Sequence, residues 1–334
     1  MKKLLTVVFL AAATFAATGY KVLNKIKIGG AGSWDYCSMD NAARRLYVSH
    51  GTSVEVVDVD AVKVVGTIPD LHGVHGIAIA ADLGKGFISN GQSNSVTIFD
   101  LKTLAKSGEP AVGQNPDAIC YEPKTQRVFT FNGRSNDSSV LNAKTGEVVA
   151  TVALNGKPEF CAADGAGKLY NNLEDKSEVV EIDAAGAKPS VTRRVSILPC
   201  EGPSGLAIDT KGKKLFSVCD GTMAVTDIPT FKVIATPKIG QGPDAAGFDP
   251  DTGYAFSSNG SDANLSIVGL VNGKYDTIDT VPTERGARTM TVDLKTHRVY
   301  LLAAEYPAPA AGAQPGRGRV PALPDSFHVL VVGK

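Results

Sequence analysis

The feature that most constrains this chain is a unit that recurs about every 40–45 residues, a period typical of propeller blades. Its clearest marker is a strand that begins with an aromatic residue. The seven strands of this kind begin at Tyr47, Phe87, Phe129, Tyr170, Phe216, Phe256 and Tyr300. Their spacings are 40, 42, 41, 46, 40 and 44 residues. The units lack the 3.6-residue apolar pattern of helical solenoids. We therefore expect an all-β fold, a seven-bladed β-propeller of four-stranded antiparallel blades.

Turn residues recur at one position of the unit. The pairs are His50-Gly51, Asn90-Gly91, Asn132-Gly133 and Asn259-Gly260. Tight hairpins need positive φ angles, which Asn and Gly tolerate. We therefore expect these pairs to adopt positive φ.

The two ends of the propeller chain predict how it closes. The sequence stops at Lys334, just after the third strand of the seventh unit. Residues 21–28, KVLNKIKI, resemble outer strands such as KVVGTI at 63–68. An N-terminal strand over Lys21 to Ile28 is therefore expected to complete the last blade and to cover its exposed edge.

Segments at both ends of the chain stand apart from the repeat. Residues 1–19 carry Lys2 and Lys3 and then a short apolar run, which is typical of a secretory signal peptide. Residues 20–334 are expected to form a single propeller. Residues 307–324 are rich in Pro, Ala and Gly and predict a flexible insertion in blade 7. The mature protein is expected to be a monomer in the periplasm or outside the cell.

The charge balance limits the classes of partner. The 34 basic and 34 acidic residues give a net charge of zero. Such a balance offers no field for a phosphate backbone, so nucleic acid is not expected as a partner. No apolar run after the signal is long enough to cross a membrane. A small molecule or a protein therefore remains as the expected ligand.

Several strands carry a family-like motif. The segments LYVSHG (46–51), GFISNG (86–91) and AFSSNG (255–260) are each followed by a strand of alternating apolar residues. They resemble the YVTN repeat, and the chain from Tyr20 to Lys334 resembles the secreted YVTN/YncE-like seven-bladed propellers of bacteria. The segments LYNNLE (169–174) and LFSVCD (215–220) depart from the motif. The resemblance implies a fold and export, and it implies little about activity.

Stacking the seven units places ionisable residues in one column, at the entry to the first strand of each blade. The column reads Asp35, His75, Asp117, Glu159, Ser204, Asp244 and Arg288. Carboxylates that converge at one end of the propeller axis repel unless a cation or protons compensate them. We therefore predict a ligand site at this mouth, although Asp is also common in turns for purely structural reasons.

Two further sets of candidate residues belong to the same face. A second ring of ligand contacts could come from His50, Asn90, Asn132 and Asn259, for which turn chemistry is the alternative. If a metal binds, Asp35, Asp117, Glu159 and Asp244 would offer oxygen ligands to a divalent cation such as calcium. Trp34 is expected to pack at the mouth of blade 1. We expect no other cofactor.

Five cysteines leave at least one unpaired. Cys200 enters the inner strand of blade 5 and Cys219 ends the neighbouring strand at the same face, so we expect a Cys200–Cys219 disulfide. Cys37 and Cys161 share a column with Ile77 and are interpreted as small core residues, with Cys120 beside that column.

Three function classes follow from these patterns. The first is a binding or scaffold propeller that recognises its ligand at the channel mouth, which requires no catalytic residues. The second is a lactonase-like hydrolase or lyase that uses a cation held by the acidic ring. The third is an accessory subunit of a periplasmic redox enzyme. The sequence favours the first class, assigns no catalytic residue and leaves the identity of the ligand open.

Overall fold

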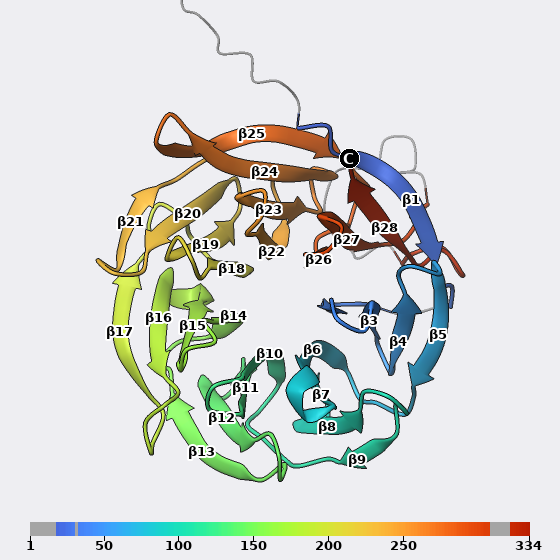
Figure 1. Cartoon of the computed structure of the whole chain (residues 1–334), viewed down its shortest axis with the longest axis vertical. Coiled ribbons are helices and arrows are strands. Elements are labelled where there is room, and N and C mark those ends of the chain that lie inside the picture. Colours follow the sequence, from blue (N-terminus) through green and yellow to red (C-terminus); the bar gives the residue numbers. More distant parts are fainter. Residues whose placement is uncertain (1–17, 31–32, 308–320) are drawn as a thin grey trace, which may run out of the picture.

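Seven four-stranded antiparallel sheets surround one axis, as Figure 1 shows for this computed structural model. The structure describes residues 18–30, 33–307 and 321–334. The predicted all-β seven-bladed propeller is confirmed. The predicted signal peptide, apart from residues 18 and 19, lies outside the described residues, and so do residues 308–320 of the predicted insertion.

Blades 1 to 6 each use four strands in chain order, from the axis to the rim. Blade 1 contains β2 (Cys37–Asp40), β3 (Arg45–His50), β4 (Ser53–Asp58) and β5 (Lys63–Ile68). Blade 2 contains β6 (Val74–Ala80), β7 (Lys85–Asn90), β8 (Ser95–Asp100) and β9 (Lys106–Gly108), with the one-turn 3-10 helix η1 (Ala81–Leu83). Blade 3 contains β10 (Pro116–Glu122), β11 (Arg127–Asn132), β12 (Asp137–Asn142) and β13 (Val148–Ala153).

The next three blades repeat this order. Blade 4 contains β14 (Pro158–Ala163), β15 (Lys168–Leu173), β16 (Glu178–Asp183) and β17 (Ser190–Ser196), with η2 (Glu174–Lys176). Blade 5 contains β18 (Leu206–Asp209), β19 (Lys214–Cys219), β20 (Thr222–Asp227) and β21 (Lys232–Ala235). Blade 6 contains β22 (Pro243–Asp249), β23 (Tyr254–Asn259), β24 (Asn264–Val271) and β25 (Lys274–Pro282).

Blade 7 joins the two ends of the chain. Its strands are β26 (Met290–Asp293), β27 (Arg298–Ala303), β28 (His328–Gly333) and, at the rim, β1 (Lys21–Lys27). β1 pairs antiparallel with β28, from Lys21 opposite Gly333 to Lys27 opposite His328. Figure 1 shows the blue β1 beside the red β28, near the C-terminus. The predicted closure by the N-terminal strand is confirmed.

The core is divided into seven apolar clusters, one between each pair of neighbouring blades. The aromatic residue that marks each repeat supplies the largest side chain of its cluster or one of comparable size. All seven are at most 1 % exposed, namely Tyr47, Phe87, Phe129, Tyr170, Phe216, Phe256 and Tyr300. Each packs toward the following blade, so the periodic aromatic holds successive blades together.

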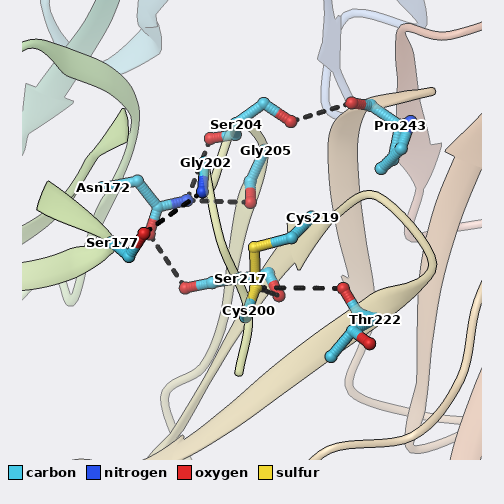
Figure 2. Close-up of a disulfide and its surroundings, with 10 residues drawn as sticks. All are labelled: Asn172, Ser177, Cys200, Gly202, Ser204, Gly205, Ser217, Cys219, Thr222 and Pro243. Atoms are coloured by element: carbon cyan, nitrogen blue, oxygen red, sulfur yellow. Dashed lines mark hydrogen bonds between the residues drawn. A yellow bond between two sulfur atoms is a disulfide. The ribbon is translucent and has the colours of Figure 1, made fainter. Parts of the chain in front are cut away.

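Polar side chains of the second strands tie neighbouring inner strands together. In blade 4 the Asn172 amide donates to the carbonyl oxygens of Ser204 and Gly205, at 2.9 and 3.0 Å. Ser217 of blade 5 donates to the Asn172 amide oxygen, and Ser204 donates to the Pro243 carbonyl at the start of blade 6. Figure 2 shows this chain of contacts from blade 4 to blade 6.

In blades 2 and 6 the neighbouring inner strands are tied together by the serine of a Ser-Asn-Gly (SNG) segment, residues 89–91 and 258–260. Ser89 donates to the carbonyl of Asp117 at 2.5 Å and accepts from the backbone N–H of Gly76 at 2.8 Å. Ser258 likewise donates to the Arg288 carbonyl of the next blade. These bonds set where the inner strands begin and thereby position the predicted ring of ionisable residues.

One of the four turn pairs contains the positive φ that the sequence predicts, at Gly51 with φ 65°. Gly91, Gly133 and Gly260 do not have positive φ, and the positive angles of their turns fall at Asn94, Asn136 and Ala263. A Cβ at Gly91 would lie 2.6 Å from His75 Nε2, and a Cβ at Gly260 would lie 2.8 Å from the Cβ of Arg288. At these two positions glycine is therefore needed because ring side chains pack against the turn.

The structure holds two disulfides. Cys200 and Cys219 are joined, as expected from the sequence, with their Cα atoms 5.4 Å apart (Figure 2). A second bridge joins Cys120 to Cys161, so the interpretation of Cys161 as a small core residue is wrong. Cys120 follows the column of Ile119 by one residue and so faces blade 4, whereas Cys161 lies in that column and faces blade 3. Cys37 is buried and unpaired.

Weakening β1 should destabilise the whole ring. Ile26 is the buried residue of this otherwise exposed strand, at 2 % exposure. Ile26→Ala should lower the free energy of unfolding by about 2–5 kcal/mol in urea titrations. The matched control Val22→Ala, at an exposed site of the same strand, should stay within about 0.5 kcal/mol of wild type. Equal effects of the two substitutions would contradict this role of β1.

Peptide mapping without reductant should recover two linked pairs, Cys120 with Cys161 and Cys200 with Cys219. Cys37 should react with iodoacetamide only after denaturation, because it is buried and burial raises the pKa of its thiol. The double variant Cys120→Ser/Cys161→Ser should lose about 4 kcal/mol of stability by the loop-closure estimate for a 41-residue separation. A Cys37-containing disulfide in the native protein would overturn this assignment.

Candidate ionic ring at the propeller axis

Six of the seven column residues carry ionisable side chains, and most of them contact a neighbour around the axis. His75 Nδ1 lies 2.5 Å from Asp35 Oδ2 and 3.6 Å from Asp117 Oδ1. Arg288 Nε lies 2.7 Å from Asp244 Oδ2, and its NH2 group lies 3.7 Å from Asp35 Oδ1. The side chains of blades 6, 7, 1, 2 and 3 thus form one continuous chain of charge. Ser204 of blade 5 instead bonds to the backbone of blade 6.

Blade 4 adds Glu159 and a lysine that the column analysis did not include. Lys157 Nζ lies 2.9 Å from Glu159 Oε1. The same ammonium group also pairs with Glu174, which is 41 % exposed. Glu159 itself is only 10 % exposed. Lys157 therefore pairs with two carboxylates at once, Glu159 of the ring and Glu174 at the surface.

Three of the ring carboxyls have raised pKa values. Burial, together with the negative charges of Asp35 and Asp244, raises the pKa of Asp117 to about 7 even though His75 acts in the other direction. Burial and the charge of Asp117 raise the pKa of Glu159 to about 8, against the effect of Lys157. Burial and Asp35 also raise the pKa of Asp244, against Arg288. The cations present do not fully compensate the carboxylates.

The basic groups of the ring stay charged at neutral pH. Burial favours the neutral imidazole of His75, but its hydrogen bond with Asp35 and the charge of Asp117 outweigh this and raise the pKa to about 9. Burial likewise opposes the charge of Arg288, and Asp244 and Asp35 raise its pKa. His75 is therefore a proton donor to Asp35 and not a free base near pH 7.

An aromatic pair crosses the axis next to the ring. One residue further along the inner strands, the column contains Tyr36 and Phe160 among five small residues, Gly76, Ala118, Gly205, Ala245 and Thr289. The Tyr36 and Phe160 rings meet edge to face, with centroids 4.9 Å apart. They come from blades 1 and 4 and are the two large side chains of this column.

Tyr36 is subject to the charge of the ring carboxylates. Burial, followed by the charges of Asp244, Asp117, Asp35 and Glu159, raises the pKa of Tyr36 well above its usual value. These four acids belong to four different blades. The site therefore combines carboxylates, a phenol and an aromatic surface.

Three residues of the expected second ring are fully buried asparagines, Asn90, Asn132 and Asn259. Each amide donates across its own hairpin, for example from Asn132 to Ser139 at 3.0 Å and from Asn259 to Ser266 at 2.9 Å. The amide groups of these three residues donate hydrogen bonds within their own blades, and Asn90 Oδ1 has no partner among the described residues. That these three contact a ligand stays a prediction.

His50 belongs to a separate aromatic cluster between blades 7 and 1. Phe327 stacks on Trp34 with ring centroids 4.9 Å apart and also contacts His50 at 4.8 Å. His50 Nδ1 faces Glu55 at 3.6 Å. Trp34 is only 7 % exposed, so the cluster forms part of the core of the mouth of blade 1.

The proposed metal ligands differ in their availability. Asp35, His75 and Asp117 present ligand atoms close enough together to hold one metal ion. Binding there would require His75 Nδ1 to lose the proton that it shares with Asp35. Asp244 is engaged by Arg288 and Glu159 by Lys157. The four-carboxylate calcium set is thus already partly paired with cations of the protein.

Blades 4 and 5 enclose a separate pocket of about 330 Å³ at the opposite end of their strands. Its lining includes Lys168 and Arg193, which both pair with the buried Glu181. Burial opposes ionisation of Glu181, but Arg193 and Lys168 lower its pKa to about 2. These cations are compensated, in contrast with the carboxylates of the ring.

The sequence interpretation missed Lys157, Tyr36 and Phe160. A signal for the aromatic pair was present, because two large rings stand in a column otherwise occupied by small residues. The role of Lys157 had no such signal, since its position precedes the strand and depends on where the side chain turns.

Comparisons with known proteins give the fold. No family model matches the chain. The antigen Lp49 of Leptospira interrogans serogroup Icterohaemorrhagiae serovar copenhageni (strain Fiocruz L1-130) is 24 % identical over 237 residues, or 66 % of this chain. The chain spans about half the length of this curated relative, 52 %.

Solved structures agree on the architecture. A structure of Kuenenia stuttgartiensis hydrazine synthase matches with a TM-score of 0.69 and 17 % identity, covering 88 % of this chain and 96 % of that one. The U3-55K structure gives 0.71 at 11 % identity, covering 95 % and 99 %. The RRP9 WD40 repeats give 0.73 at 11 % identity, covering 96 % and 99 %. At such identities the likeness shows a β-propeller and no specific activity.

Removing a ring carboxylate should stabilise the protein at alkaline pH. A carboxyl with a raised folded-state pKa contributes stability at low pH that is lost as the pH rises through that value, about 7 for Asp117 and about 8 for Glu159. Glu159→Gln and Asp117→Asn should therefore melt at a higher temperature than wild type at pH 9, and near wild type at pH 5.

A control on the same blade should behave in the opposite way. Glu181 has a lowered pKa, because Arg193 and Lys168 outweigh its burial, so Glu181→Gln should lower the melting temperature at pH 9. Calorimetric scans at pH 5, 7 and 9 give the comparison. If Glu159→Gln and Asp117→Asn lose stability at pH 9, as Glu181→Gln should, the ring is a structural ion-pair network.

Proposed function

We propose that this protein is an exported YVTN-type propeller that binds a positively charged ligand at the ionic ring. The observation that carries the proposal is the incomplete compensation of two shielded carboxyls, Asp117 and Glu159. Their raised pKa values mean that the folded protein holds negative charge at a cost in stability. A bound cation would remove that cost.

Other features support a binding role. His75 is committed to Asp35 as a proton donor, so the imidazole is not poised as a general base. Two disulfides favour an oxidising compartment, in agreement with the signal-like N-terminus. The SNG segments and the serine contacts that they make support the YVTN assignment. Among the described residues no helix is long and apolar enough to cross a bilayer.

The second candidate function is a cation-dependent hydrolase or lyase. It is favoured by one observation, the ability of Asp35, His75 and Asp117 to approach a single metal ion. In that case a divalent ion would bind and Asp117→Asn would abolish both its binding and the turnover of a lactone. If Asp117→Asn abolishes metal binding but the wild-type protein shows no measurable turnover, only the binding function remains.

A thermal-shift screen at pH 8 tests the proposed function. Calcium, magnesium, choline, arginine and putrescine form the cationic panel, and citrate and phosphate form the anionic panel. At least one cation should raise the melting temperature, since a ligand at a hundred times its Kd adds about 2.7 kcal/mol. The shift should disappear in Asp117→Asn and persist in the control Glu181→Gln. A shift from anions alone, or one that survives Asp117→Asn, would contradict the proposal.

A further inference from the structure

The compensation of charge around the ring is uneven. On one side, Arg288 lies between Asp244 and Asp35, and His75 donates to Asp35 at 2.5 Å. On the side of blades 3 and 4, the nearest cation to Asp117 is His75, whose Nδ1 lies 3.6 Å from Oδ1 and is already engaged by Asp35. Glu159 pairs with Lys157, which also serves Glu174. The unmet negative charge therefore lies between blades 3 and 4.

One buried oxygen atom on this side lacks a hydrogen-bond donor. Asp117 Oδ1 is buried and has no hydrogen-bond partner among the described residues. Tyr36 is nearby in the inner column and is only 4 % exposed, and burial together with the charges of the four ring acids raises its pKa. Buried polar groups are normally paired, so Asp117 Oδ1 points to a missing donor.

The surroundings specify more than positive charge. The Tyr36 and Phe160 rings, in edge-to-face contact at 4.9 Å, supply an apolar aromatic surface beside the carboxylates. Gly76 and Ala118 occupy the corresponding positions of blades 2 and 3 and add no aromatic side chain there. A ligand at this place meets oxygen acceptors on one side and aromatic carbon on the other.

These features suit an organic cation better than a bare metal ion. Calcium takes six to eight oxygen ligands, and aromatic carbon offers none. A primary ammonium group has three N–H donors, as the lysine side chain does, and aromatic rings attract such cations. We propose that the Asp117–Glu159 side of the ring binds the ammonium group of a primary alkylamine, with the Tyr36 hydroxyl as its third acceptor. This inference rests on the proposed function, whose ligand class it narrows.

Two consequences follow for specificity. A quaternary ammonium of similar size carries the charge but no N–H donor, so it should bind less tightly than a primary amine. A neutral alcohol of the same length can donate one hydrogen bond but brings no charge. Tyr36→Phe removes the hydroxyl and keeps the ring that packs on Phe160, so it tests the third acceptor without opening a cavity.

Isothermal titration at pH 8 with propylammonium chloride provides the test. Tetramethylammonium chloride, 1-propanol and calcium chloride are the matched ligands. Propylammonium should bind wild type, tetramethylammonium should bind at least about tenfold more weakly, and 1-propanol should give no heat above dilution, because hydrogen bonds to charged groups are the stronger class. Tyr36→Phe should weaken propylammonium about tenfold at an unchanged melting temperature, and Glu159→Gln should weaken it further.

The possible outcomes separate this inference from the proposed function. If calcium binds in an Asp117-dependent way and propylammonium does not, the amine inference is wrong and a cation-binding ring remains. If neither cation binds and the wider cationic panel is also inert, both are wrong. Equal propylammonium affinities in wild type, Tyr36→Phe and Glu159→Gln would place the amine elsewhere and overturn the inference.

Discussion

The packing of one aromatic side chain into each interface between neighbouring blades is the interaction on which the rest of this structure depends. Seven such residues, from Tyr47 to Tyr300, are almost fully buried, and each faces the following blade. Tyr300 can complete the seventh interface only because blade 7 packs on blade 1, and β1 supplies the outer strand of blade 7. The circle of blades is therefore a single cooperative unit in which the two chain ends are neighbours.

The repeated motif also explains how charge reaches the axis. In the SNG segments the serine bonds to inner-strand backbone, the asparagine donates across its own hairpin, and the glycine leaves space for a ring side chain. Because these contacts are local and repeated, they impose a common starting point on the inner strands. The variable column residues then face one another around the axis. Repulsion among them is offset by His75 and Arg288 on one side and only partly by Lys157 on the other.

Much of the fold could be predicted from the sequence because each blade repeats the same pattern of buried residues and turns. The period, the closing strand and the Cys200–Cys219 pair depend on local patterns that recur or lie close together in the chain. The Cys120–Cys161 bridge was missed because adjacent residues of a strand face different blades, so cysteines one column apart can meet. The hairpin contacts of Asn90, Asn132 and Asn259 were not predicted, because they depend on side-chain burial. Tyr36 and Lys157 reach the ring through side-chain directions that no periodicity encodes.

The central claim is that the ring holds carboxyl groups with raised pKa values, which a bound cation would lower. An NMR titration of the side-chain carboxyl carbons of Asp117 and Glu159 measures this most directly. The account predicts titration midpoints of about 7 and about 8 in the ligand-free protein, and a fall of both when propylammonium saturates the site. Midpoints near the ordinary value of about 4 for both carboxyls, unchanged by the amine, would contradict it.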